Sequence, residues 1–139
     1  MVIKRAALAA VLFACLPAAA EEIVGPARAI EGDSLVVGET FLRLCGVVSL
    51  DVGEARYRRE STALSALVAG KTVRCVPLGE GTPCDGIANG EIYKRRIAQC
   101  FVEDKDLAAE MIRSKSACAW KAESGEAYTG LGCVSDRRQ

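Results

Sequence analysis

The sequence contains no histidine, and this absence excludes several kinds of chemistry. Ser-His-Asp hydrolysis, Cys-His proteolysis and two-histidine ribonuclease catalysis all need an imidazole that titrates near neutral pH. Proton transfer would therefore fall to carboxylates or water, and charge stabilisation to arginine or a metal ion. A zinc site is disfavoured as well, because the chain lacks both histidine and a C-x-x-C pair.

Long apolar runs and an excess of positive charge are also missing. The apolar run from Ala6 to Leu16 is shorter than the roughly 20 residues that a membrane-spanning helix needs, so we expect no transmembrane helix. The 18 basic side chains are matched by 18 acidic ones, whereas nucleic-acid-binding domains are usually visibly basic. Attraction to phosphate would have to come from two local clusters, which are Arg56, Arg58 and Arg59, and Lys94, Arg95 and Arg96. Either cluster also fits an ordinary solvated face.

The first 20 residues have the three parts of a secretion signal. A positively charged start and an apolar run are followed by small residues in an A-x-A arrangement that ends at Ala20. We therefore expect residues 1–20 to be a cleaved signal peptide and the protein to be secreted or periplasmic. One alternative stays open, because residues 12–15 (L-F-A-C) resemble a lipoprotein cleavage box that would leave the chain anchored through Cys15.

Cleavage after Ala20 leaves residues 21–139, a length typical of one domain. This mature chain carries 16 basic and 18 acidic side chains, and no internal repeat or linker divides it. Six cysteines remain: Cys45, Cys75, Cys84, Cys100, Cys118 and Cys133. An even number of cysteines in a small exported domain predicts disulfides rather than a metal site.

Periodicity predicts short strands and two helices. Strands and tight turns are expected from residue 23 to 45, as a three-stranded meander over 27–30, 35–37 and 41–45. The later elements are a helix over 54–69, a strand over 72–76, a loop over 78–90, a strand over 92–102, and a helix over 107–112 capped by Asp104 or Asp106. Beyond Trp120 the pattern weakens, and three glycines argue against a long final helix.

This order of elements suits a five-stranded β-barrel with helices, of the OB type, in which a helix separates the third and fourth strands. Small α+β sandwiches give similar strings of elements, so the order alone leaves both architectures open.

Four blocks of sequence narrow this choice. They are residues 29–35 (A-I-E-G-D-S-L), 43–51 (R-L-C-G-V-V-S-L-D), 59–75, which opens with R-E-S and closes with A-G-K-T-V-R-C, and 91–100 (E-I-Y-K-R-R-I-A-Q-C). In this order they resemble the V-I-D-G-D-T-L, R-L-x-G-I-D-A-P-E, R-E-A and D-x-Y-G-R-x-V-A-x-C blocks of the staphylococcal nuclease (thermonuclease) family. The resemblance covers nearly all of residues 21–139 and implies a nuclease-like OB-fold domain.

The family resemblance also implies a calcium-dependent phosphodiesterase site. Arg43 and Arg95 match the two arginines that hold the phosphate, and Asp33 matches the first calcium-binding aspartate. Ser49 takes the position that supplies a main-chain carbonyl to calcium, and Asp51 that of the glutamate that positions water. A divalent cation and paired guanidinium groups would counter the negative charge that develops on the phosphoryl oxygens.

Two departures weaken the implied site. The second calcium-binding aspartate falls on Val48, which has no side-chain oxygen, and calcium needs six to eight oxygen ligands. Asp51 is one methylene shorter than the glutamate it replaces, and Leu50 stands for the preceding proline. Glu91 and Lys94 replace an aspartate and a glycine of the last block. Glu31 could substitute as a metal ligand, although nothing in the sequence requires it.

The sequence therefore predicts an exported nuclease-like protein that is catalytically weak or inactive and binds an anionic, phosphate-bearing or envelope partner. Calcium binding is expected to be weak or absent. The alternative is an active metal-dependent endonuclease that cleaves DNA or RNA through Asp33, Glu31 and Asp51 in an altered geometry.

The expected barrel also suggests how the cysteines pair. Cys75 and Cys100 lie on antiparallel neighbouring strands, where opposite positions bring side chains close enough for a disulfide. Cys118 and Cys133 flank the glycine-containing C-terminal region and are expected to pair with each other. Cys45 and Cys84 remain for a third bridge, although Cys45 could equally be a small buried hydrophobic residue.

Overall fold

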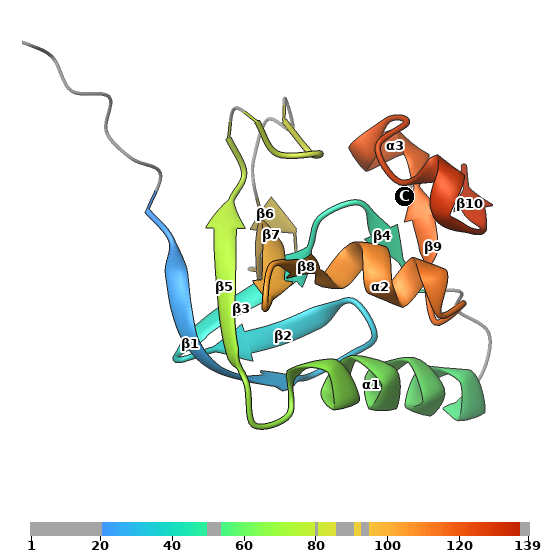
Figure 1. The fold of residues 1–139 in the computed structure, drawn as a ribbon. Helices are drawn as coiled ribbons and strands as arrows, with labels where there is room; N and C mark the ends of the chain where they lie inside the picture. Colours follow the sequence, from blue (N-terminus) through green and yellow to red (C-terminus); the bar gives the residue numbers. More distant parts are fainter. Residues whose placement is uncertain (1–20, 50–53, 80, 86–90, 93–94, 137–139) are drawn as a thin grey trace, which may run out of the picture.

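A computed structural model describes residues 21–49, 54–79, 81–85, 91–92 and 95–136. The expected signal peptide, with Cys15, and Asp51 lie outside these residues. Five strands form the body of the fold (Figure 1): β1 (Ile23–Ala29), β2 (Ser34–Val37), β3 (Thr40–Leu44), β5 (Thr72–Pro77) and β7 (Arg95–Val102).

These five strands close into a barrel. β1, β2 and β3 form an antiparallel meander, and β3 then pairs in parallel with β7. β7 pairs antiparallel with β5, which pairs antiparallel with β1 and so completes the circle. The structure confirms the predicted fold class, a closed five-stranded mixed barrel with helices that has an OB-like architecture.

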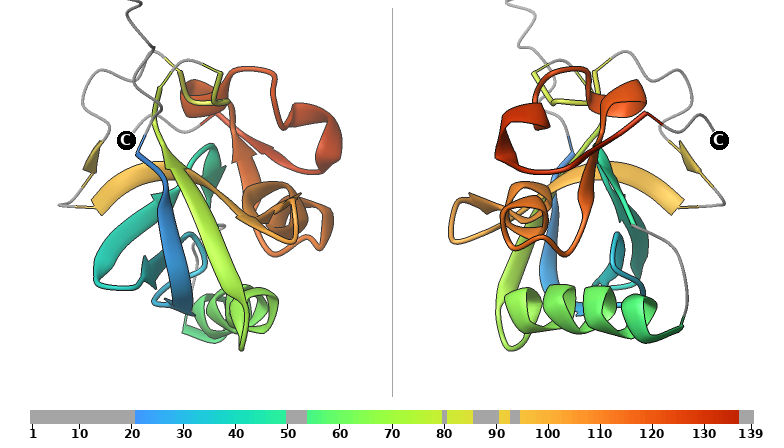
Figure 2. Two further views of the ribbon diagram at one scale, coloured as in Figure 1. Left: turned by 60° about the vertical axis from the view of Figure 1, so that its left-hand side comes forward. Right: turned by 90° about the vertical axis from the view of Figure 1, so that its right-hand side faces the viewer.

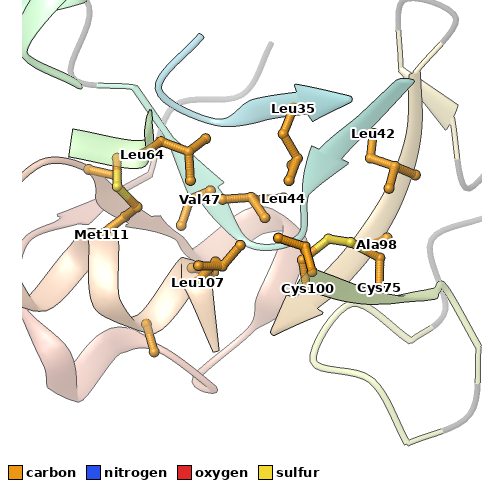
Figure 3. Packing of buried hydrophobic residues seen from close by; sticks show 14 of the residues in the cluster. Leu35, Leu42, Leu44, Val47, Leu64, Cys75, Ala98, Cys100, Leu107 and Met111 are labelled. Atoms are coloured by element: carbon orange, nitrogen blue, oxygen red, sulfur yellow. A yellow bond between two sulfur atoms is a disulfide. The ribbon is translucent and has the colours of Figure 1, made fainter. Parts of the chain in front are cut away.

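The barrel interior is filled by the apolar residues that alternate along each strand (Figure 3). Leu35, Leu42, Leu44 and Val73 are fully buried there, and Ala98 of β7 joins them. Successive side chains of a strand point to opposite faces, so Ser34 and Arg43 lie on the outer face of β2 and β3. The alternation that buries the leucines therefore also positions the polar residues considered below.

Helix α1 (Glu54–Val68) lies across one end of the barrel (Figures 1 and 2). Leu64 and Val68 are buried in the core, in agreement with the predicted helical spacing. Gly70 follows the helix with a φ of 67°, a left-handed conformation that glycine adopts at helix ends without a steric penalty.

Helix α2 (Leu107–Arg113) begins at Asp106, one of the two predicted caps. The Asp106 carboxylate accepts hydrogen bonds from the amides of Ala108 and Ala109 at 2.9 and 3.3 Å. Asp104 does not cap the helix; its φ is 62° and it lies in the turn between β7 and β8 (Lys105–Asp106).

The last part of the chain packs on the side of the barrel as a short segment that we call the C-terminal cover (residues 118–136). It consists of β9 (Cys118–Trp120), α3 (Lys121–Ser124), the 3₁₀ turn η1 (Thr129–Leu131) and β10 (Val134–Ser135). β9 pairs antiparallel with β4 (Val47–Val48) and parallel with β10. No long final helix forms in this described segment, as the sequence predicted.

Three disulfides connect the described cysteines in the expected pairs: Cys45–Cys84, Cys75–Cys100 and Cys118–Cys133. Cys75 and Cys100 are register partners on β5 and β7, which confirms the predicted strand pairing. Cys45 and Cys84 lie with Ile97 in a second, smaller apolar cluster.

The single strand expected over residues 92–102 is wrong at its beginning. β6 (Glu91–Ile92) pairs antiparallel with the start of β7, with Glu91 opposite Arg96 and Ile92 opposite Arg95. The sequence gave no sign of this pairing, because the two residues between them, Tyr93 and Lys94, include no glycine, asparagine or aspartate of the kind that marks a tight hairpin. Within the described part of the chain, no helix has the length and apolar character needed to cross a bilayer.

Candidate functional site

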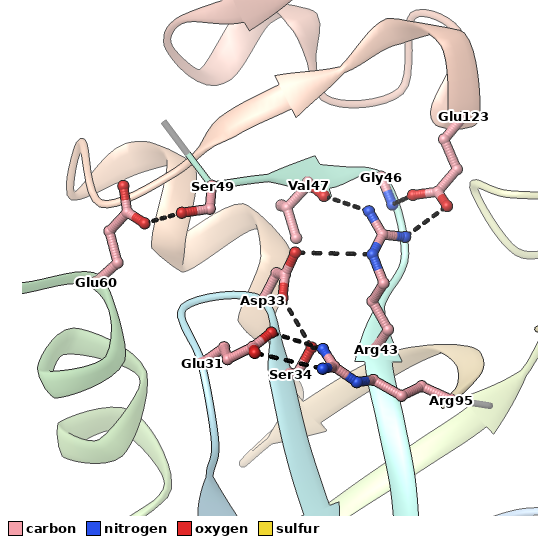
Figure 4. Close-up of polar contacts among 10 residues, drawn as sticks. All are labelled: Glu31, Asp33, Ser34, Arg43, Gly46, Val47, Ser49, Glu60, Arg95 and Glu123. Carbon is pink, nitrogen blue, oxygen red and sulfur yellow. Dashed lines mark hydrogen bonds and ion pairs between the residues drawn. The ribbon is translucent and has the colours of Figure 1, made fainter. Parts of the chain in front are cut away.

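The predicted site residues gather on the outer face of β2, β3 and β7, where the C-terminal cover packs against the barrel (Figure 4). Ser34 and Arg43 are register partners on β2 and β3. The turn after β3 leads into β4, which pairs with β9 of the cover. Residues that are far apart in the sequence therefore meet at this corner.

Arg43 is buried and its guanidinium group is surrounded by protein acceptors. Its side chain is only 7% exposed. Nη1 donates to Oε1 of Glu123 at 2.6 Å, and Nη2 donates to the main-chain oxygen of Val47 at 2.8 Å. Nε lies 3.7 Å from Oδ2 of Asp33. The sequence argument that a charge within this strand needs a partner is thus satisfied inside the protein.

Glu123 of α3 is the strongest of these partners. Its carboxylate bridges two groups of the barrel, because Oε1 accepts from Arg43 and Oε2 accepts from the amide of Gly46 at 2.6 Å. The side chain of Glu123 is 3% exposed. Burial raises its pKa above the ordinary value, while the neighbouring Arg43 charge and the Gly46 hydrogen bond act in the opposite direction.

The ring of Trp120 covers this ion pair. The Cζ atom of Arg43 lies 5.0 Å from the ring centroid, a distance at which the guanidinium charge is attracted to the aromatic face. The Trp120 amide donates to the main-chain oxygen of Gly46 at 2.8 Å. The strand end and the turn are therefore tied together on both sides of Arg43.

Arg95, the second predicted arginine, is paired with Glu31. Its Nη1 and Nη2 donate to the two oxygens of Glu31 at 2.6 and 3.3 Å, a fork that matches the carboxylate geometry. Nη1 also donates to Oγ of Ser34 at 2.7 Å, and Ser34 donates to Oδ1 of Asp33 at 2.7 Å. Arg95 is 26% exposed and Glu31 34% exposed. Arg43 and Arg95 thus lie on either side of the Asp33–Ser34 pair.

A third carboxylate is buried beside this network. Glu60 of α1 is 2% exposed and accepts a hydrogen bond from Oγ of Ser49. A Cβ atom on Gly32 would lie 2.6 Å from Cβ of Glu60, so the helix can approach the turn before β2 only because residue 32 is glycine. The Arg59-Glu60-Ser61 block therefore contributes a residue that joins α1 to the site region.

The described residues do not fit the calcium site that the family resemblance implies. Asp33 is the only predicted carboxylate ligand among them, and it is already paired with Arg43 and Ser34. Val48, in β4, offers no side-chain oxygen, and Glu31 is bound to Arg95. Across the described ranges no group of three or more histidine, cysteine, aspartate or glutamate side chains is placed to hold a metal ion.

Together, the fold and the site define a disulfide-bonded OB-like barrel with a buried arginine–carboxylate network on its outer face. No family model matches the sequence, and a search of curated proteins finds no match.

Sequence reasoning missed Glu123, Gly46 and Trp120. Glu123 follows Trp120 in a region without clear periodicity, and nothing in the sequence separates it from Glu126, which is exposed and pairs with Lys121. The available signal was indirect: a buried Arg43 requires a carboxylate from some other part of the chain.

Proposed function

We propose that this chain is an exported, nuclease-like OB-barrel protein that binds an anionic, phosphate-bearing partner and is catalytically weak or inactive. The staphylococcal nuclease type rests on the four sequence blocks, with which an OB-like barrel is compatible. Export, to a secreted or periplasmic location, is supported by the expected signal peptide and by three disulfides, which form and persist in oxidising compartments.

The observation that carries the proposal is the state of Arg43. An arginine that stabilises a phosphoryl transition state must aim its donors at the place where negative charge develops. Here Glu123, Asp33 and the Val47 carbonyl already face the three guanidinium nitrogens. A charge that is neutralised by a buried carboxylate contributes little to a substrate phosphate.

Binding without efficient cleavage is supported by the other basic residues of the region. Arg95 keeps about a quarter of its side chain exposed, and its neighbour Arg96 is exposed on β7. Because the mature chain has no overall positive charge, binding to a polyanion should be moderate and should weaken as salt is added.

A cleavage assay tests the proposal. Purified protein is incubated with single-stranded DNA while calcium is titrated from zero to millimolar concentrations, with EDTA and Arg43→Ala as controls. We expect the wild-type rate to stay close to both controls. Val48→Asp, alone or with Asp51→Glu, should add little while Glu123 remains paired with Arg43.

Two results would contradict the inactive assignment. One is calcium-dependent cleavage that disappears in Arg43→Ala. The other is a gain of about tenfold or more from Val48→Asp alone, which would mean that the missing ligand is the main defect, since lost metal contacts typically cost about 10- to 100-fold.

A further inference from the structure

The barrel directs two donors at one carboxylate. Nη1 of Arg43 and the amide of Gly46 hold the two oxygens of Glu123, each at 2.6 Å. Charge-assisted bonds of this kind, from a guanidinium and a main-chain amide to separate oxygens, are how proteins commonly bind oxyanions. Both donors belong to β3 and the turn after it, whereas the carboxylate comes from the C-terminal cover.

The Gly46 amide is accessible to that carboxylate because residue 46 has no side chain. Its φ is 74°, in the left-handed region that favours glycine. A Cβ atom here would lie 2.6 Å from Cβ of Ser124 and 2.8 Å from Cδ2 of Tyr128. The turn is therefore shaped so that α3 can approach closely and place an anion on the amide.

The surroundings strengthen both bonds. Arg43 and Glu123 are almost completely buried, and the Trp120 ring lies over the guanidinium group. Hydrogen bonds to charged groups are stronger where water is excluded. A small oxyanion in the place of the Glu123 carboxylate would meet the same two donors in the same dry environment.

We propose that Arg43 and the Gly46 amide form a phosphate-binding cradle, and that Glu123 fills this cradle as an internal substitute for the ligand. The inference deepens the proposed function and takes from it only the class of ligand. The ligand group is a phosphate, either free or in the phosphodiester chain of a nucleic acid. It binds Arg43 only when α3 moves Glu123 away.

The position of α3 makes such a movement local. The helix is four residues long and ends at Gly125, which has a φ of 56°. It lies inside the loop that the Cys118–Cys133 disulfide closes. Displacing α3 therefore leaves the barrel strands and their apolar interior in place.

Removing the Glu123 side chain should convert the cradle into an open anion site. Thermal unfolding is measured for the oxidised wild-type protein, Glu123→Ala, Glu123→Gln and the double variant Glu123→Ala/Arg43→Met. Glu126→Ala is the matched control, because Glu126 lies three residues further along and pairs with Lys121 at the surface. Each protein is studied in sodium phosphate, in sodium chloride of equal ionic strength, and with a single-stranded oligonucleotide.

For Glu123→Ala we expect the unfolding midpoint to rise by about 5 °C or more in 50 mM phosphate relative to chloride. The wild type and Glu126→Ala should change by less than about 1 °C, and the double variant should lose the response. Glu123→Gln should respond less than Glu123→Ala, because its amide still occupies the cradle. A response to the oligonucleotide as well identifies a phosphodiester ligand, and a response to phosphate alone identifies a free phosphate or phosphomonoester.

The proposal fails if Glu123→Ala responds no more than Glu126→Ala, if its response survives in the double variant, or if it folds in neither salt. Phosphate should at least rescue a variant whose cradle has been vacated. DNA cleavage by the wild-type protein would overturn the proposed function but would leave this test unaffected, because the unfolding midpoint does not depend on turnover.

Discussion

The barrel and the C-terminal cover are held by different kinds of contact. The barrel interior is an apolar layer in which residues such as Leu35, Leu44 and Val73 are fully buried, and the strands complete one another's hydrogen bonds around the circle. The cover depends on a few polar contacts and one disulfide. Glu123 holds it to Arg43, and Tyr128 donates to Oδ2 of Asp106 at 2.6 Å.

This difference teaches where single substitutions should matter. Apolar burial is shared among many side chains, so the barrel does not depend on any one polar partner. The cover joins the barrel at isolated points, and each point leaves a buried polar group without its partner when it is removed. We therefore expect the effects of polar substitutions to concentrate at the boundary between the two regions.

The largest effect is expected from the Arg43–Glu123 pair. Glu123→Ala should lower the free energy of unfolding by about 3–5 kcal/mol, since it leaves a buried guanidinium largely uncompensated. Glu126→Ala, on the same segment but exposed, should leave it unchanged within error. Urea unfolding of both variants in chloride buffer measures this difference, and equally small losses would mean that the cover is not anchored through Arg43.

A smaller effect is expected from the disulfide of the cover. The double variant Cys118→Ala/Cys133→Ala opens a loop with a sequence separation of 15 residues and should lose about 3 kcal/mol on the chain-entropy estimate. The loss should be local, so limited proteolysis followed by mass spectrometry should find the first cuts within residues 121–133. First cuts within β1 to β3 would show that the two regions do not unfold separately.

The smallest effect is expected from the hydroxyl of Tyr128. Tyr128→Phe should cost about 1–2 kcal/mol at neutral pH, because it removes one bond to a carboxylate. Asp106 keeps its bonds from Gln99 and from the amides of α2. The carboxylate is therefore not left without partners.

The same substitution should change the dependence of stability on alkaline pH. Burial, together with the Asp106 hydrogen bond, raises the pKa of Tyr128 above its ordinary value of 10.0. The unfolded chain then loses this proton before the folded protein does, so the contribution of Tyr128 is complete below pH 10 and declines as the pH rises further. Unfolding curves should show a steeper alkaline loss for the wild type than for Tyr128→Phe, and parallel losses would contradict the assignment.

The sequence predicted the barrel because the barrel follows local rules. The alternation around Leu35 and Leu42, the helical spacing of Leu64 and Val68, and a turn or cap between elements can all be seen in short windows of sequence. The pairing of Cys75 with Cys100 followed once the two strands were taken as neighbours. The errors came where no local rule applies, as in the hairpin between β6 and β7.

The site was predicted only in part, and for a physical reason. The conserved-looking blocks pointed to Arg43, Arg95 and Asp33, and the structure brings all three to one corner. Their partners could not be predicted, because Glu123 is 80 residues from Arg43 in the sequence. A long-range ion pair leaves no periodic pattern, and nothing distinguished this glutamate from its exposed neighbours.

The contact between the Gly46 amide and the Glu123 carboxylate tests the central claim most directly. Hydrogen exchange of the Gly46 amide can be followed by NMR in the wild-type protein, in Glu123→Ala and in Glu126→Ala, with β-barrel amides as internal references. We predict slow exchange at Gly46 in the wild type and Glu126→Ala, and much faster exchange in Glu123→Ala while the barrel amides stay protected. Equal exchange at Gly46 in the wild type and Glu123→Ala would contradict the claim that Glu123 fills this site.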